Sequence, residues 1–172
     1  NFMDDKTLSH SYKGDPTNVI QSALDIESEF ASKNKMKINS SKCHAITFNF
    51  SSKNSEPTNL TLNGETINNC DKIKLLGVII SKDLKWRENT KEICGKVNRK
   101  LYLLSKLKYF GLTINELASF WKTVLRPLTE YASPLWHSGL TQFDANELES
   151  LQGRALGMIC GVKYIDLSLI HI

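Results

Sequence analysis

Two adjacent carboxylates near the amino end are the residues of this sequence best suited to chemistry. They stand in the stretch Phe2-Met3-Asp4-Asp5-Lys6-Thr7-Leu8, where apolar residues flank the pair on both sides. Aspartate favours turns because its side chain accepts hydrogen bonds from nearby backbone groups, so the stretch predicts a strand, a tight turn and a second strand. Carboxylates on a rigid turn suit Mg²⁺, which prefers oxygen ligands and serves in phosphoryl transfer. An ordinary solvated turn is the alternative interpretation.

The elements that follow must position this pair, and the first of them is a helix. Asp15 as N-cap and Pro16 at the first helical position predict its start, and it should end near Lys33. Alternating apolar residues over 36–50 then predict a β-hairpin that carries Lys42 at its bend. The helix is expected to pack one face on a sheet.

Two glycines in the next segment carry structural information. Asn63-Gly64 is the dipeptide typical of a two-residue hairpin turn. Gly77 falls within a predicted strand over residues 72–80, which indicates either a β-bulge or the close approach of another backbone.

The second half of the chain is predicted to be helical. From Glu88 the apolar residues recur at helical spacing and form a stripe, which consists of Ile93, Val97, Leu101, Leu104 and Leu107. The opposite face of this predicted helix carries Lys91, Arg99, Tyr102 and Lys106. Basic residues in this arrangement indicate either contact with a polyanion or a solvated helix surface.

Two further helices are predicted downstream. Thr113 with Glu116 forms a capping box that begins one of them. Pro127 should break or kink this helix, although residues 128–135 could continue it after a bend. The last helix is expected over residues 144–159. Four aromatic residues among apolar neighbours are predicted to pack in the core rather than to stack on bases, and these are Trp86, Trp121, Trp136 and Tyr131.

Composition narrows the class of protein. The 172 residues carry a net charge of +4 and are 41% hydrophobic, which indicates a globular chain. Residues 85–126 hold ten Lys or Arg against three Glu, a balance of +7 that favours a polyanion partner. The sequence has no apolar run near the roughly 18 residues that a membrane span needs. Its four cysteines lack zinc-site spacing, which favours a reduced, intracellular setting, nuclear or cytoplasmic.

The order of these motifs resembles the reverse transcriptases of non-long-terminal-repeat (LINE-type) retrotransposons. The resemblance runs from Phe2 to about Gly161, and Phe2-Met3-Asp4-Asp5 is similar to the family's catalytic aromatic-x-Asp-Asp hairpin. The other segments that carry it are Met36-Lys37-Ile38-Asn39-Ser40-Ser41-Lys42-Cys43 (a palm motif), Leu76-Gly77-Val78 with Asp83-Leu84-Lys85-Trp86 (the primer grip), and Leu101 to Leu107, Arg126-Pro127, Glu130-Tyr131-Ala132-Ser133-Pro134-Leu135-Trp136 and Glu149-x-x-Gln152-x-x-Ala155 (the thumb region).

The resemblance implies a role for each candidate site residue. Asp4 would bind both Mg²⁺ ions with Asp5 beside it, and Lys42 would protonate or neutralise the leaving pyrophosphate. The primer grip would be Leu76, Gly77 and Val78, the glycine allowing close approach of the primer backbone. The phosphates of the template–primer duplex would be contacted by Lys91, Arg99 and Lys106. The alternatives are an exposed turn lysine, a simple bulge and a solvated helix face.

The implied fold is α+β, with a partial antiparallel palm sheet and its packing helix followed by an α-helical thumb. Residues 1–87 would be the C-terminal part of the palm, residues 88–161 the thumb and following region, and residues 162–172 a tail that matches nothing expected. Phe2 replaces a commoner Tyr of the family, and Cys43 a commoner Thr. The family's third metal-binding carboxylate and its fingers lie upstream of this stretch, so the chain is expected to be a fragment that is inactive alone.

The implied partners are an RNA template, a DNA primer, deoxynucleoside triphosphates, Mg²⁺, and the missing fingers and upstream palm of the parent chain, with no membrane involved. Two other hypotheses stay open from the sequence. The chain could be a non-catalytic nucleic-acid-binding module in which only the basic helical part works, or an inactive folded remnant of a retroelement. Duplex binding that needs no Mg²⁺ and falls steeply with salt would favour the binding module.

Overall fold

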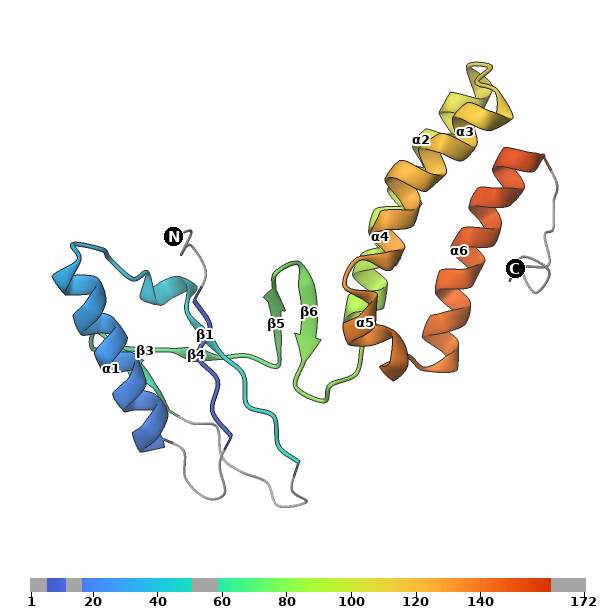
Figure 1. Cartoon of the computed structure of the whole chain (residues 1–172). Coiled ribbons are helices and arrows are strands. Elements are labelled where there is room, and N and C mark those ends of the chain that lie inside the picture. The colour runs from blue at the N-terminus through green and yellow to red at the C-terminus, as the bar shows by residue number, and fades with distance from the viewer. Residues whose placement is uncertain (1–5, 12–16, 51–58, 162–172) are drawn as a thin grey trace. The chain divides into compact units, whose positions relative to one another are not determined.

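The computed structural model describes residues 6–11, 17–50 and 59–161, and Figure 1 shows them as a ribbon. The predicted Asp4-Asp5 turn, the helix start at Asp15-Pro16 and the tail 162–172 lie outside these residues. The chain divides into two compact units, Asn1–Ile73 and Lys74–Ile172.

The first unit packs one long helix on short strands. Helix α1 (Thr17–Lys33) is followed by the 3₁₀ turn Ser40–Lys42, β1 (His44–Ala45), β2 (Thr61–Leu62), β3 (Glu65–Thr66) and β4 (Asn68–Asn69). Its described core cluster consists of Leu60, Leu62 and Ile67, and Ile20, Leu24 and Ile38 pack against these residues. The amphipathic pattern of α1 therefore places its apolar side on the β2–β3 hairpin, as predicted.

The Asn63-Gly64 hairpin is confirmed. Strands β2 and β3 pair antiparallel, with Thr61 opposite Thr66 and Leu62 opposite Glu65. Asn63 has φ 53° and Gly64 φ 81°, the left-handed pair that a type I′ turn requires.

The predicted hairpin over residues 36–50 is wrong. Residues 40–42 form a 3₁₀ turn, and the short strand β1 pairs with β4 in parallel instead. Local hydrogen bonds stabilise this polar turn. The Ser41 hydroxyl donates to Asn39 Oδ1 at 2.6 Å, and the Lys42 backbone N–H donates to the Asn39 carbonyl at 3.1 Å. Lys42 therefore ends a 3₁₀ turn, and β1 finds its partner much later in the chain.

Residues 72–81 form two strands where one was predicted. Strands β5 (Lys72–Leu75) and β6 (Val78–Ser81) form a hairpin, and its turn is Leu76-Gly77 with φ 46° and φ 85°. The placement of Gly77 within a strand is therefore wrong. The turn was missed because Leu76 is apolar and belongs to a continuous apolar run, whereas turns of this type usually hold Asn or Asp at that position.

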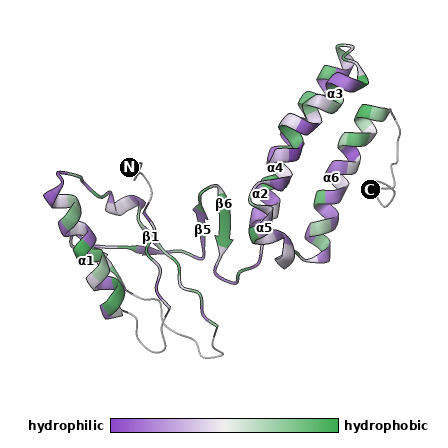
Figure 2. Cartoon of the chain, in the orientation of Figure 1, coloured by the Kyte–Doolittle hydropathy of each residue, from purple (hydrophilic) through white to green (hydrophobic). Residues whose placement is uncertain are grey.

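Helices make up the rest of the second unit. They are α2 (Arg87–Tyr109), α3 (Ile114–Phe120), a π-helical segment (Trp121–Leu125), α4 (Arg126–Glu130), α5 (Ser133–Trp136), a 3₁₀ turn (His137–Gly139) and α6 (Gln142–Cys160). The predicted α2 stripe is confirmed, because Ile93, Val97, Leu101 and Leu104 are buried. Leu117, Leu125 and Trp136 join them, with Leu148, Leu151, Ala155 and Ile159 from α6. Figure 2 shows the resulting alternation of apolar and polar residues along the helices.

The helical path does not stop at Pro127. Proline lacks an N–H and its ring crowds the carbonyl four residues earlier, which opposes a regular α-helix. The preceding turn widens into the π-helical segment, in which the Arg126 N–H donates to the Trp121 carbonyl five residues back. The break comes later, at Tyr131 and Ala132, where Ala132 takes φ 52°.

The described residues form an α+β fold, as predicted at the level of class. Their strands form three two-stranded sheets, one of them parallel, rather than one continuous antiparallel sheet. Within the described ranges, none of the helices combines the length and the apolar character needed to cross a membrane.

Candidate nucleic-acid interface

The predicted catalytic residues fall mostly outside the described structure. Asp4 and Asp5 lie in the undescribed first five residues. Lys42 is exposed at the end of its 3₁₀ turn. Across residues 6–11, 17–50 and 59–161, no three His, Cys, Asp or Glu side chains gather as a metal site would need. The magnesium prediction concerns Asp4 and Asp5, which lie outside the described residues and whose carboxylate oxygens suit that ion.

Leu76 and Gly77 of the predicted primer grip form the β5–β6 turn, and Val78 begins β6. Leu76 is exposed, whereas Val78 is buried in the core of the helical unit. The Tyr131 hydroxyl donates a hydrogen bond to the Leu76 carbonyl at 2.7 Å. A side chain added at Gly77 would meet the Tyr131 ring at 3.4 Å. The positive φ at this position therefore favours glycine, and a side chain here would point toward the Tyr131 ring.

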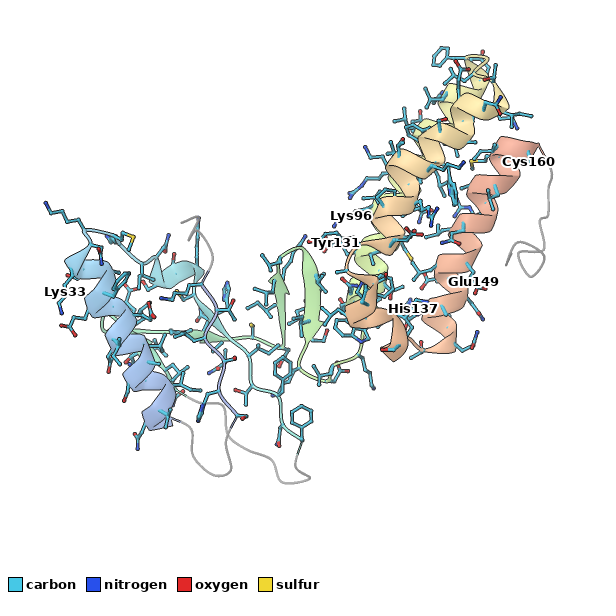
Figure 3. All side chains as sticks on the ribbon, in the orientation of Figure 1. Lys33, Lys96, Tyr131, His137, Glu149 and Cys160 are labelled. Atoms are coloured by element: carbon cyan, nitrogen blue, oxygen red, sulfur yellow. The ribbon has the colours of Figure 1, made fainter. Side chains whose placement is uncertain are left out.

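Tyr131 was predicted to pack in the core, and this is wrong, because 56% of it is exposed. It lies where α4 ends, as Figure 3 shows, and its carbonyl accepts a hydrogen bond from Trp136 Nε1 at 2.9 Å. Trp136 is fully buried, and Trp86 and Trp121 pack partly buried against the same core, as predicted. Tyr131 therefore connects the buried Trp136 to the hairpin turn at Leu76.

The exposed face of α2 holds the three predicted phosphate-contacting residues. Lys91, Arg99 and Lys106 are all exposed, and spacings of eight and seven residues keep them on one side of a helix with 3.6 residues per turn. Lys91 pairs with Glu88 at 2.7 Å, and the Lys106 ammonium lies 5.5 Å from the centroid of the Tyr102 ring. Arg99 forms no ion pair with any residue that the structure describes.

Gly95 lies on the same face and was not singled out from the sequence. A Cβ built there would meet nothing within 4 Å, so packing does not require a glycine at this position. Glycine within a helix costs about 1 kcal/mol relative to alanine. Its presence leaves a flat section of backbone between Lys91 and Arg99.

Charge along α2 is uneven. Glu92, in the first half of α2, accepts hydrogen bonds from Lys74 and Lys96. These bonds hold the pKa of Glu92 below its usual range, and the bond from Lys74 has the larger effect. Residues 96–109 contain five Lys or Arg and no acidic residue. Lys96 is one of these five and pairs with Glu92, so α2 itself leaves four cations of its carboxyl-terminal half unbalanced, namely Arg99, Lys100, Lys106 and Lys108.

An ion-pair network fixes the amino end of α2 on α6. Arg87 donates to Asp144 Oδ1 at 2.8 Å and also pairs with Glu147. Asp144 is 2% exposed, and burial raises its pKa, but hydrogen bonds from Thr141 and Arg87 outweigh burial and leave the pKa below its ordinary value. Thr141 Oγ1 also caps α6 by accepting from the Asp144 N–H at 3.2 Å. This network orients the exposed face of α2 in the helical unit.

Two exposed aromatic residues at the carboxyl end of α2 escaped the sequence analysis. Tyr109 is 83% exposed and Phe110 is 74% exposed, and their rings are in edge-to-face contact at 5.9 Å between centroids. For Tyr109, the sequence offered one indication of exposure: it follows Tyr102 by seven residues, which places the rings of Tyr102 and Tyr109 on the face opposite the apolar stripe.

The first unit has an open depression of about 520 Å³ between α1 and the β2–β3 turn. It is lined by Asp25, Ser28, Glu29, Ser32, Lys33, Thr61, Asn63 and Gly64. None of the predicted site residues lines it, and its mixed charges are all exposed to water. It therefore gives no specific indication of a ligand.

Comparisons with protein-family models, with curated proteins and with solved structures found no match to this chain. The candidate interface therefore stands on its own geometry, namely the exposed face of α2 with its adjoining hairpin turn.

Proposed function

We propose that this chain is part of an RNA-directed DNA polymerase of the non-LTR retrotransposon type, and that its helical unit binds the template–primer duplex. The observation that supports this most is the exposed face of α2, where Lys91, Arg99 and Lys106 align on a helix whose last fourteen residues have no acidic side chain. Such a face matches a phosphate backbone in charge and in length.

The dimensions of this face suit a nucleic-acid strand. At 1.5 Å per residue, the steps from Lys91 to Arg99 and on to Lys106 span about 10–12 Å each. One strand of a duplex advances about 3.4 Å per nucleotide, so each step covers about three nucleotides. Contacts of this kind position a duplex without reading its sequence. Gly95 lies between the first two cations and leaves room for the duplex to approach the helix backbone.

The catalytic part of the proposal rests on the resemblance. Asp4 and Asp5 would hold Mg²⁺, which when bound polarises the transferred phosphate. Lys42 would neutralise charge on the leaving pyrophosphate, and the Leu76-Gly77 turn, held by Tyr131, would contact the primer. In-line displacement needs its groups held in one geometry, and a further carboxylate from upstream palm would complete the set. The chain by itself is therefore proposed to bind without polymerising.

A non-catalytic nucleic-acid-binding module is the second candidate. It is favoured by the helical unit having its own core, built from α2, α6 and the segments between them. A unit with a core of this kind can present the basic face of α2 without the palm. The two candidates share the duplex-binding face and differ only in catalysis.

Duplex binding is tested by fluorescence anisotropy with a short labelled RNA–DNA duplex. We expect Arg99→Gln with Lys106→Gln to weaken binding about tenfold or more. A control of equal charge change, Lys33→Gln with Lys37→Gln, changes lysines of α1 and the loop after it in the other unit (Figure 3 labels Lys33) and should bind as the unmodified chain does. Equal losses in the two double variants would contradict a specific interface on α2.

Catalysis is tested by primer extension with the complete reading frame that contains this chain. Asp4→Ala should abolish extension while duplex binding persists, because the carboxylate serves the metal ions. Equal extension with and without Asp4→Ala would end the catalytic assignment. Duplex binding by a frame that never extends a primer would favour the non-catalytic module.

A further inference from the structure

The carboxyl end of α2 exposes three aromatic rings beside its positive charge. Tyr102, Tyr109 and Phe110 are 66%, 83% and 74% exposed and take no part in the core that the other face of α2 forms. Single exposed aromatic residues are common on protein surfaces. Three within the nine residues 102–110, which hold two lysines and no acidic side chain, form a distinct surface, called here the aromatic end of α2.

Helix geometry places the rings of Tyr102 and Tyr109 along one line. Tyr102 and Tyr109 are seven residues apart, which is nearly two turns and about 10 Å, and Phe110 follows directly. That distance is close to three nucleotide steps of a strand. The Lys106 ammonium lies between the two tyrosines in sequence and 5.5 Å from the Tyr102 ring. Rings and cations therefore alternate along the helix.

We infer that the aromatic end of α2 is a binding site for single-stranded nucleic acid, whose unpaired bases stack on Tyr102 and Tyr109 while Arg99 and Lys106 contact the phosphates. Bases within a duplex are stacked on one another and hide their faces, so exposed rings can stack only on unpaired bases. The inference rests on the proposed nucleic-acid function and extends it from the duplex to the strand that continues beyond it.

Other occupants fit these observations less well. The core of a protein–protein interface is depleted of lysine, whereas the Lys106 ammonium lies beside the Tyr102 ring here. A helix that packs on a partner helix shows aliphatic residues at i, i+3 and i+4. This face shows one such residue, the 41% exposed Leu103, among tyrosines and cations. An anionic membrane shares the charge preference and is included as an outcome of the experiment.

The experiment compares a labelled single-stranded RNA with a labelled RNA–DNA duplex of the same length, by anisotropy at one salt concentration. Tyr102→Leu with Tyr109→Leu keeps bulk and helix propensity but removes the rings. We expect it to weaken single-strand binding about tenfold or more and to leave duplex binding within about twofold. The control, Tyr102→Phe with Tyr109→Phe, keeps both rings and should bind both ligands as the unmodified chain does.

A second measurement needs no variant. An RNA that carries 2-aminopurine should lose fluorescence on binding the unmodified chain, because stacking quenches this base. Unchanged single-strand affinity in the leucine variant, or no quenching, would overturn the inference and leave duplex binding by α2 in place. Tighter binding to phosphatidylserine vesicles than to RNA, lost in the leucine variant, would also overturn it. Failure of the unmodified chain to bind either nucleic acid would reject the proposed function as well.

Discussion

At the scale of single residues, two glycines of the helical unit differ in backbone conformation and in the space around them. Gly77 has φ 85° and lies against the Tyr131 ring, so its conformation demands glycine. Gly95 lies within regular helix and faces open space. The first glycine is needed for the fold, whereas the second weakens the helix and fits an approaching ligand.

Alanine at these two positions should therefore have opposite effects. Gly77→Ala should lower the free energy of unfolding by about 1–2 kcal/mol, because a side chain in the left-handed region is strained. Gly95→Ala should raise it by about 1 kcal/mol through helix propensity. Urea denaturation of the two variants measures both changes, and a stabilised Gly77→Ala variant would show that the Leu76-Gly77 turn is assigned incorrectly.

A second residue-scale prediction concerns the hydroxyl of Tyr131. Tyr131→Phe removes the 2.7 Å hydrogen bond to the Leu76 carbonyl and keeps the ring. Because Leu76 is exposed and water can replace the donor, we expect a loss of about 0.5–1 kcal/mol in unfolding free energy. Tyr109→Phe is the matched control on an exposed ring and should be neutral in the same thermal or urea unfolding assay. Equal effects of the two changes would argue against the Tyr131–Leu76 bond.

At the scale of elements, the position of α2 depends on its junction with α6. Arg87 at the start of α2 binds Asp144 in the first turn of α6, and Asp144 also accepts from the capping residue Thr141. Since α2 carries the proposed interface, the buried Asp144 carboxylate helps to position the interface by holding the amino end of α2.

Asp144→Asn should cost about 1–3 kcal/mol of unfolding free energy at neutral pH, because it weakens bonds between charged groups. The lowered pKa of Asp144 means that its contribution is present above the unfolded-state pKa, about 4, and is lost as the pH falls through the lower folded-state value. The difference between variant and unmodified chain should therefore shrink on acidification, for example between neutral pH and pH of about 3. A difference that stays constant with pH would contradict the role of the Asp144 charge.

At the scale of the whole molecule, sequence patterns correctly predicted features that depend on neighbouring residues, but they did not predict contacts between distant residues. The α2 stripe, the Thr113–Glu116 capping box and the Asn63-Gly64 turn are confirmed, because each depends on residues close in sequence. The pairing of β1 with β4 and the contact of Tyr131 with Leu76 join residues far apart in the chain, which no local pattern encodes.

The candidate site divides in the same way. Lys91, Arg99 and Lys106 were predicted to share a face because helical periodicity fixes it, and the structure places them so. The Leu76-Gly77 turn was mistaken for a strand because its residues are apolar. The exposure of Tyr131 depends on how α4 ends and could not be read from its apolar neighbours. The roles of Asp4, Asp5 and Lys42 stay predictions from the resemblance.

The most direct test of the central claim is the salt dependence of duplex binding. The logarithm of the association constant should fall linearly with the logarithm of salt concentration, between about 50 and 200 mM, with a slope of about 0.9 for each phosphate contact. We predict that Arg99→Gln with Lys106→Gln reduces the magnitude of this slope by about two, since it removes two contacts. An unchanged slope would show that the exposed face of α2 does not bind the phosphate backbone.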